Sequence, residues 1–169
     1  MNILIDNSIN FIVGFGKNRE KKLRELFRFQ FRMALMFGKV FINEDFNSVI
    51  LFIHSKNFNF KRLLLEVQLV LRVIGIKNIY KVLKRERVLK MNHSNSDYVH
   101  LWLMGTKPSF QGRGQGTILL KQALEHYTGR TVILETTALD NLNFYQKSGF
   151  QIFEENHVLN YPLYFMRYD

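Results

Sequence analysis

The spacing of apolar and polar residues in the first half of the chain predicts helices around a hairpin. Apolar residues recur at helical spacing over Arg19–Phe37, and Gly38 is suited to end that helix. Two short β-prone runs, Lys39–Ile42 and Ser48–Ile53, flank a polar turn and are expected to pair as a hairpin. The segment Phe60–Ile74 is apolar nearly all round, which predicts a buried helix.

The second half of the chain alternates strands with helices. Strands are predicted at Tyr98–Met104 and Thr131–Thr136, and the apolar face of Thr117–Tyr127 predicts a helix between them. A strand–helix–strand unit of this kind implies two parallel strands joined by a right-handed crossover.

The C-terminal part of the chain predicts one more helix and two more strands. Asp140 is expected to cap a short helix that Gly149 ends, and Phe150–Asp169 predicts the two strands. Because the hairpin and the tail favour antiparallel neighbours, the sheet is predicted to be mixed, in an α/β (α+β) fold. With two prolines and no Gly/Ser-rich linker, residues 1–169 are predicted to form a single domain.

Positive charge is concentrated in two segments. The chain has 24 Lys and Arg against 14 Asp and Glu, a net charge of +10, and residues 17–32 and 77–90 together hold 13 basic and 3 acidic residues. In the second segment, Ile79–Met91 predicts a basic surface helix. A basic surface can attract nucleic acid or an acidic partner, but a solvated helix face explains the same charge, and we favour that explanation.

The residue types exclude several kinds of site. The chain has no cysteine, which excludes a disulfide framework, a thiolate metal site and a cysteine nucleophile. Its five histidines include no i, i+4 pair, so no metal site is predicted. No apolar run approaches the roughly 20 residues of a membrane span, and without an export signal the cytoplasm is the expected compartment.

A glycine-rich segment, Gln111–Gly116, lies between a predicted strand and a predicted helix. Glycines let backbone N–H groups converge on an anion, and the helix behind them adds about half a positive charge at its N-terminus. The segment therefore predicts a phosphate site. It lacks the lysine of a P-loop, because Thr117-Ile118 follows the last glycine.

The glycines alone leave two alternatives open. A dinucleotide-binding oxidoreductase would have a third glycine where Thr117 stands, although Glu135 falls about 20 residues on, where a ribose-binding acid would lie. A glycine-rich turn without any ligand is the second alternative.

Two motifs around the glycines narrow this choice. The stretch Met104–Gly116 ends in the pattern Gln-x-x-Gly-x-Gly, and Leu134-Glu135-Thr136 and Asn141–Phe150 follow, the last with a Phe-Tyr and a Gly-Phe pair. In this order they resemble the acetyl-CoA loop and the second motif of the GNAT family of N-acetyltransferases, most of all the branch that contains puromycin N-acetyltransferase. The resemblance covers Tyr98–Asp169, whereas the first 97 residues match only in outline.

The resemblance implies a fold and a cosubstrate. It implies a GNAT-like mixed, mostly antiparallel sheet flanked by helices, whose central parallel strands, the fourth and fifth, splay apart around acetyl-CoA. Backbone amides of the glycine loop would hold the pyrophosphate, and backbone groups of Met104 and Thr106 would pair with the pantetheine arm. The residues implied in cofactor binding are Met104, Thr106, Gln111, Gly112, Arg113, Gly114, Gln115, Gly116 and Asn141.

The resemblance also implies catalytic roles. The Met104 amide would stabilise the oxyanion, and Tyr145 would protonate the departing CoA thiolate. Many family members carry a glutamate in the fourth strand, but Leu101-Trp102-Leu103 holds no acid, which leaves Glu135 as the substitute base and His100 as a weaker candidate. Each role has a structural alternative, because Tyr145 could be a core aromatic and Glu135 a salt-bridged strand residue.

The expected function is transfer of an acetyl group from acetyl-CoA to a primary amine of a small molecule or peptide, without a metal. The rivals are a dinucleotide-binding oxidoreductase and a basic module that binds nucleic acid or an acidic partner around a vestigial cofactor site. No membrane partner is expected, nucleic acid is disfavoured, and a second copy of the chain is left open as a partner. The sequence does not identify the acceptor.

Overall fold

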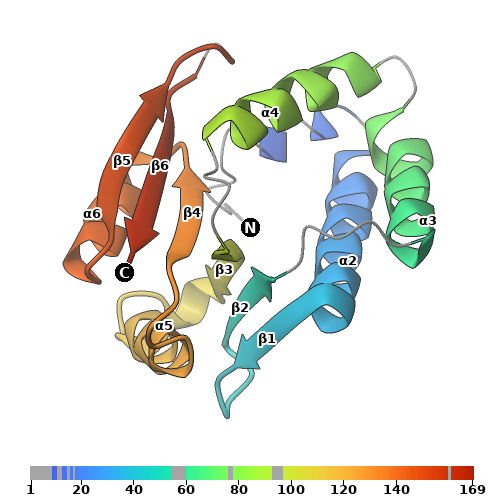
Figure 1. The fold of residues 1–169 in the computed structure, drawn as a ribbon. Coiled ribbons are helices and arrows are strands. Elements are labelled where there is room, and N and C mark those ends of the chain that lie inside the picture. Colours follow the sequence, from blue (N-terminus) through green and yellow to red (C-terminus); the bar gives the residue numbers. More distant parts are fainter. Residues whose placement is uncertain are drawn as a thin grey trace.

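The centre of the molecule is a six-stranded sheet. The computed structural model describes residues 9–10, 13–14, 16, 18–54, 60–75, 78–92, 97–159 and 161–169. The described strands follow the order β1-β2-β3-β4-β6-β5, with β3 and β4 parallel and the other neighbours antiparallel (Figure 1). They are β1 (Gly38–Ile42), β2 (Ser48–Ile53), β3 (Val99–Thr106), β4 (Val132–Thr136), β5 (Gln151–Asn156) and β6 (Leu163–Tyr168). The predicted α+β class and mixed, mostly antiparallel sheet are confirmed.

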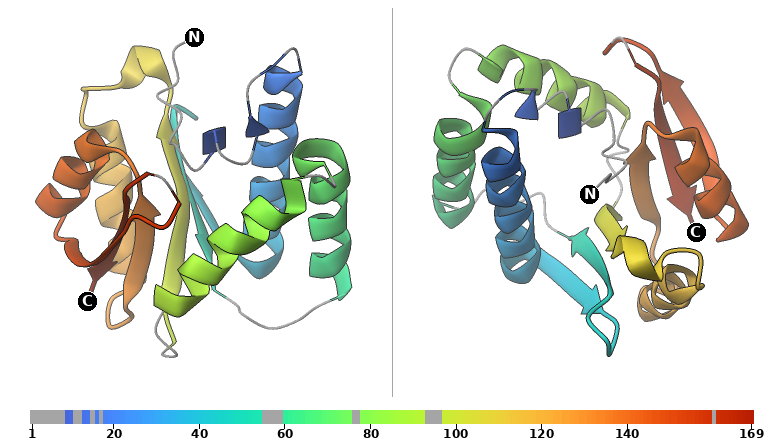
Figure 2. Two further views of the ribbon diagram at one scale, coloured as in Figure 1. Left: turned by 90° about the horizontal axis from the view of Figure 1, so that it is seen from above. Right: turned by 180° about the vertical axis from the view of Figure 1, so that it is seen from behind.

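Helices cover both faces of this sheet. Two of them, α5 and α6, lie on one face, and α2, α3 and α4 lie on the other side (Figure 2). The helical segments are α2 (Arg19–Phe37), α3 (Phe60–Leu69), which continues as the π-helical turn η1 (Val70–Ile74), α4 (Ile79–Asn92), the 3-10 turn η3 (Pro108–Phe110), α5 (Gln115–His126) and α6 (Leu139–Lys147).

The largest apolar cluster packs α5 and α6 against the sheet. Among its fully buried members are Ile50, Phe52, Val99, Leu120 and Val132. Burial of one such side chain contributes about 1.5–3 kcal/mol to folding. The cluster therefore holds the N-terminus of α5, and the glycine loop before it, firmly against the central strands.

The opposite face of the sheet is covered by α2 and α4. In α4, Val88 and Leu89 share a smaller apolar cluster with Leu163 and Phe165 of the β6 strand. The helix α2 meets β3 at a different point, where the Phe29 and Trp102 rings lie edge to face with centroids 5.9 Å apart. Two helices from the first half of the chain thus reach the strands of the second half.

The residue after α2 has a different role from the one predicted. Gly38 is the first residue of β1, with an extended backbone (φ −161°), and is not a left-handed helix cap. A Cβ built on Gly38 would lie 1.8 Å from the carbonyl oxygen of Phe52. Glycine is needed here because β1 and β2 approach too closely for a side chain.

The prediction that Phe60–Ile74 is buried nearly all round is wrong. Leu64, Val67 and Leu71 are 47%, 47% and 66% exposed, and among the side chains described over residues 63–74 the buried ones are Val73 and Ile74, at the end of η1. Leu69 and Val73 pack with Leu26 of α2, so one side of the segment is covered and the opposite side is exposed.

The predicted start of the last helix is also corrected. α6 begins at Leu139, and its N-cap position belongs to Ala138, which makes no side-chain cap hydrogen bond. Asp140 lies in the first turn instead, where a carboxylate is favoured by the helix dipole.

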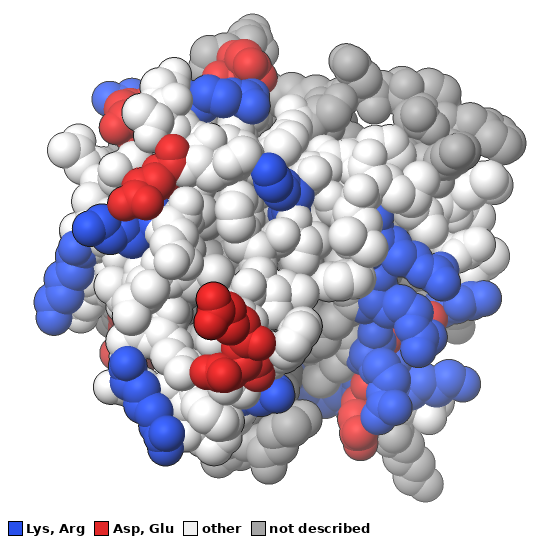
Figure 3. Space-filling model, turned by 90° about the horizontal axis from the view of Figure 1, so that it is seen from below, with Lys and Arg blue, Asp and Glu red and all other residues white. Residues whose placement is uncertain are grey.

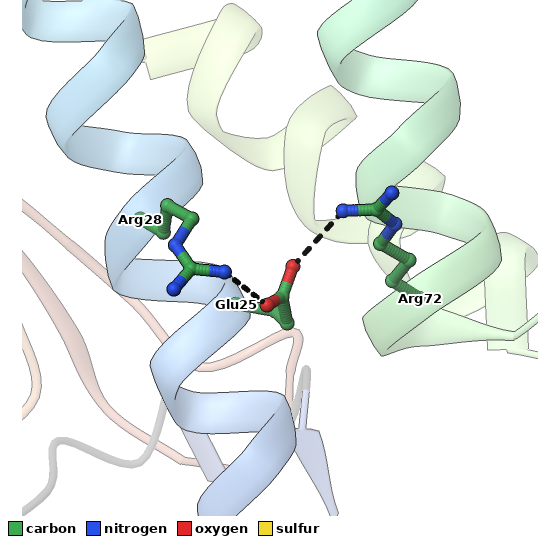
Figure 4. A network of polar contacts seen from close by, with 3 residues as sticks. All are labelled: Glu25, Arg28 and Arg72. Carbon is green, nitrogen blue, oxygen red and sulfur yellow. Dashed lines mark hydrogen bonds and ion pairs between the residues drawn. The ribbon is translucent and has the colours of Figure 1, made fainter.

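An ion-pair network joins α2 to η1. Glu25 accepts a hydrogen bond from Arg28 in its own helix at 2.7 Å and another from Arg72 at 3.3 Å (Figure 4). Both arginines are largely exposed, so each pair contributes little, about 1 kcal/mol at most. The network orients the two helices and adds little to stability.

Basic side chains gather on the side of the molecule that holds α2 and α3 (Figure 3). Within α2, Arg24 and Glu20 form an exposed i, i+4 pair at 3.2 Å. Lys17 and Lys77 of the basic segments lie outside the described residues. In the part of the chain that the structure describes, no helix is long and apolar enough to cross a membrane.

Candidate active site

The two parallel strands part after a short stretch of pairing. β3 and β4 are paired at Val99–Val132 and His100–Ile133 only, although both strands run on beyond these residues. We call the opening between the remainders of β3 and β4 the β3–β4 gap. The predicted splay of the parallel pair therefore exists, between the third and fourth described strands rather than the fourth and fifth.

The main chain of β3 directs polar groups toward this gap. The Lys107 N–H donates to the Asn47 carbonyl at 2.8 Å, and pairing partners alternate along an antiparallel ladder. The N–H and C=O groups of Met104 and Thr106 consequently point away from β2 and toward the gap. This is the orientation that an extended ligand chain needs to pair with β3 as an added strand.

A β-bulge sets that orientation. Phe52 of β2 is opposite Leu101, but Leu51 is opposite Leu103, so Trp102 is the extra residue of β3. The extra residue reverses which main-chain groups face β4 beyond it. Without the bulge, the Met104 and Thr106 groups would be consumed by the ladder with β2.

The glycine loop has the backbone shape of an anion cradle. Gly112 and Gly114 have φ of 74° and 75°, a left-handed conformation that favours glycine, and a Cβ on either would meet open space. Gly114 is the N-cap of α5, and its carbonyl accepts the Ile118 N–H at 3.0 Å. The free N–H groups of the first turn of α5 therefore open directly onto the loop.

Gly116 has a different function in the same loop. A Cβ there would lie 3.0 Å from Met104 Cε and 3.1 Å from Thr106 Oγ1. The missing side chain thus lets the first turn of α5 lie close to β3. The Thr106 hydroxyl is further held by Ser48 Oγ at 2.9 Å.

Three side chains of the loop have separate environments. The Gln111 Nε2 group donates to the Thr106 carbonyl at 3.1 Å, which ties the loop to the end of β3. The Arg113 guanidinium lies over the Phe110 ring, 5.2 Å from its centroid. The Oε1 atom of Gln115 is buried without a hydrogen-bond partner among the described residues.

The two predicted residues of α6 lie beside the gap. The Asn141 Nδ2 group donates to the Thr136 hydroxyl at 3.3 Å. Tyr145 is buried, and its ring lies edge to face with those of Phe144 and Phe150, at centroid distances of 5.2 and 5.6 Å. Tyr145 is therefore a core aromatic, as the structural alternative proposed, and it lines the cavity described below as well.

The predicted base and its weaker rival turn out to be partners. Glu135 Oε2 lies 2.8 Å from His100 Nε2, and the two side chains are 6% and 16% exposed. Burial, followed by the neighbouring carboxylate of Glu135, raises the pKa of Tyr98 to about 12, so this phenol stays protonated. In the sequence analysis Glu135 and His100 are separate candidates for the base. In the structure they contact one another, Glu135 from β4 and His100 from β3.

One large cavity connects these features. It has a volume of about 1610 Å³ and extends from the glycine loop through the β3–β4 gap to the inner sides of α2 and α4. The predicted site residues that line it are Met104, Thr106, Gln111, Gly112, Gly114, Gln115, Gly116, Glu135, Asn141 and Tyr145. Arg113 is not among the lining residues.

The cavity also contains residues that sequence reasoning missed. Gln30 and Phe29 of α2, Arg85 and Glu86 of α4, and Trp102 of β3 all line it. No local motif marks them, because they reach the cavity only when the helices of the first half fold over the strands of the second. No group of three or more His, Asp or Glu side chains within the described ranges could hold a metal ion.

Comparisons with known proteins agree with this geometry. Residues 72–152 match the family model described as acetyltransferase (GNAT) domain, which includes β3, the glycine loop, α5, β4 and α6. No curated protein sequence matches the chain.

Solved structures match over nearly the whole chain. A histone acetyltransferase HPA2 and related acetyltransferase from Corynebacterium glutamicum has a TM-score of 0.69 at 17% identity, with 98% of this chain and 83% of that chain covered. Arylalkylamine N-acetyltransferase 2 from Aedes aegypti has a TM-score of 0.57 at 14% identity (95% and 85% covered). The C-terminal condensation domain of Ebony, in complex with beta-alanyl-dopamine, has a TM-score of 0.60 at 10% identity (95% and 85% covered). At such identities the likeness concerns the fold.

The topology, the splayed strands and the matched segment define a GNAT acetyltransferase domain. Residues 72–152 thus match the GNAT acetyltransferase model, and the described chain has the GNAT fold. The rival dinucleotide-binding fold requires a doubly wound parallel sheet, and the described strands form a single parallel pair.

Proposed function

We propose that the protein transfers the acetyl group of acetyl-CoA to a primary amine. The observation that carries this proposal is the β3–β4 gap, because an anion cradle, main-chain groups of β3 that face the gap and the buried Glu135 carboxylate, itself paired with His100, lie along one cavity. The branch around puromycin N-acetyltransferase remains a prediction from the sequence.

The residues around the gap fit acetyl-CoA. The left-handed glycines and the first turn of α5 supply N–H groups for a pyrophosphate. The main-chain groups of Met104 and Thr106 can pair with the amides of a pantetheine arm. Asn141, on the α6 side of the gap, supplies an amide group to the same cavity.

Acetyl-CoA would supply an activated thioester, so the protein needs no nucleophile of its own. The Met104 N–H would donate to the carbonyl oxygen that becomes negative as the amine attacks. The Tyr145 hydroxyl would then give its proton to the departing sulfur. Both groups are held by buried structure, which preorganises them for these tasks.

The amine must lose a proton before or as it attacks. Glu135 lies on β4, one of the two strands that border the β3–β4 gap. Its carboxylate can accept that proton directly or through water. His100, at 2.8 Å, orients the carboxylate and can share the proton. We therefore assign the role of base to the Glu135–His100 pair rather than to either residue alone.

The test is acetyl transfer to a panel of small-molecule and peptide amines, with release of free CoA as the readout. We expect at least one amine to be acetylated in a reaction that needs both acetyl-CoA and amine. Binding of CoA to the folded protein, with no amine of the panel accelerating CoA release above the rate of hydrolysis, would contradict the proposal.

A further inference from the structure

The helical side of the cavity contains buried polar groups that the proposed chemistry does not use. The Oε1 atom of Gln30 in α2 and the Nε atom of Arg85 in α4 are buried without a hydrogen-bond partner in the described structure, and both residues line the cavity. A buried polar group left unpaired costs about 1–3 kcal/mol. Two such groups, from different helices and in one cavity, indicate a polar ligand group between α2 and α4.

Arg85 differs from the other basic residues of its helix. Its side chain is 13% exposed, whereas Lys84 and Arg87 point to solvent. One terminal nitrogen contacts the largely exposed Glu86 carboxylate at 3.3 Å, which leaves the Nε–H unused. The planar guanidinium presents its N–H groups in a fork that matches a carboxylate.

On the helical side the cavity is lined mostly by apolar residues, and Glu66 and Glu86 are the acidic ones. The Phe29 and Trp102 rings meet edge to face on the boundary between α2 and β3, and Leu26 and Val70 line the same cavity. Apolar walls favour an apolar ligand body and strengthen any ion pair formed between them. Of the basic lining residues, Arg85 is the one on the helical side, so a ligand carboxylate there would pair with it.

The turn of α4 that carries Arg85 lies near the proposed base. Both Glu135 on β4 and Glu86 on α4 contribute, after burial, to raising the pKa of Tyr98. The next turn of α4 carries Val88, which shares an apolar cluster with Phe165 of β6, and Phe165 is the register partner of Glu135, so this part of α4 lies over the strand that carries Glu135.

We propose that the acceptor amine carries a carboxylate on an apolar body, and that Arg85, assisted by Gln30, binds this carboxylate while the Glu135–His100 pair faces the amine. The inference rests on the proposed function and names its substrate class. It assigns opposite charges to the two ends of the acceptor pocket, with an apolar wall between them.

The test compares amines that differ only in a carboxylate. The pairs are 4-(aminomethyl)benzoic acid with benzylamine and 6-aminohexanoic acid with pentylamine, each assayed for kcat/KM with acetyl-CoA. We expect the acid of at least one pair to be preferred at least tenfold. We expect Arg85→Gln to reduce that preference at least tenfold, while Arg87→Gln, an exposed position on the same helix, leaves it unchanged. CoA affinity equal to that of the wild type shows that Arg85→Gln is folded.

Two results overturn the pocket assignment. One is the absence of any preference for an acid, and the other is a preference that survives Arg85→Gln. Acetylation of other amines but of none of these four belongs to the first result. If no amine of the wider panel, these four included, is acetylated, the proposed function fails, and binding alone tests the pocket. 4-(Acetamidomethyl)benzoic acid or N-acetyl-6-aminohexanoic acid must then raise the unfolding temperature of the wild type but not of Arg85→Gln, and no rise in the wild type overturns the pocket assignment as well.

Discussion

At the scale of single residues, Tyr145 has both a packing role and a proposed chemical one. Its ring is part of the main core, between Phe144 and Phe150, and the residue also lines the cavity at the β3–β4 gap. Packing would fix the hydroxyl in place, so a role as general acid and a role in the core support one another. A variant that lacks only the hydroxyl therefore tests the chemical role and leaves the packing role intact.

We expect Tyr145→Phe to lower kcat by about 10²-fold, the lower end of the range for general acid catalysis, because a thiolate is a fair leaving group unaided. CoA affinity and stability should change little, since the ring remains. Tyr80→Phe, at an exposed position, is the control. A Tyr145→Phe enzyme within twofold of wild type, with chemistry rate-limiting, would make Tyr145 a packing residue only.

Glu135 is tested by an isosteric change. Glu135→Gln removes the proton acceptor next to His100 but keeps the size of the side chain, so we expect kcat to fall at least tenfold with CoA binding intact. Glu154→Gln, on the exposed strand β5, should have no effect. Equal kcat values for Glu135→Gln and wild type at all pH values would show that the amine arrives deprotonated without this pair.

At the scale of elements, the glycine loop and its backbone angles decide cofactor binding. Gly114→Ala puts a Cβ at φ 75° into the proposed pyrophosphate site, and we expect at least a tenfold loss of CoA affinity, about 1.4 kcal/mol, by calorimetry. Gly129→Ala is the matched control, because its φ is 81°, it also meets open space, and it lies outside the cavity. Equal losses of affinity in both variants would mean that backbone strain, and not a blocked anion site, is the cause.

The end of β2 should show a dependence of stability on pH. His54 bonds to the Tyr127 hydroxyl at the end of α5, and burial, with help from nearby Arg130, lowers the pKa of His54 below 6.5. The unfolded chain therefore takes up this proton first, so the stabilising effect is present above pH 6.5 and lost as the pH falls through the folded-state pKa. Urea unfolding should show a smaller loss between pH 7.5 and 5 for His54→Gln than for wild type, and identical losses would refute this.

An element could be predicted from the sequence where a short stretch of chain carries its signal. The glycine loop, β3, β4 and α6 follow from short motifs, and the structure places them around one gap. The N-terminal apolar pattern was less informative, because Leu64 and Leu71 repeat at helical spacing whether or not another element covers them. The bulge at Trp102 has no signal in the sequence, because it depends on the register between two distant strands.

At the scale of the whole molecule, the cavity exists because the two halves of the chain fold onto one another. The second half supplies the cofactor side, and α2 and α4 close the other side over the sheet (Figure 2). This explains why the sequence identified Gln111–Gly116 but not Gln30 or Arg85, which are separated from the loop by long stretches of chain. The residues proposed to bind the cofactor lie in short stretches of sequence, whereas those proposed to bind the acceptor come together only in the folded chain.

The described basic side chains of α2 and η1 do not require a nucleic-acid partner. Part of their charge is paired within the helices, as for Arg24 with Glu20 and Arg28 with Glu25, and the others form a solvated surface. Such a surface would bind nucleic acid in a strongly salt-dependent way, if at all. Duplex DNA therefore belongs in the same experiment as the proposed cofactor.

The central claim is that the β3–β4 gap binds acetyl-CoA, and thermal unfolding with added ligands tests it most directly. The ligands are CoA, acetyl-CoA, NADP and duplex DNA, each at several concentrations and at physiological salt. We predict that CoA and acetyl-CoA stabilise the protein, by about 2.7 kcal/mol at 100 times Kd, and that NADP and DNA do not. Stabilisation by NADP or DNA, with none from CoA or acetyl-CoA, would contradict the account.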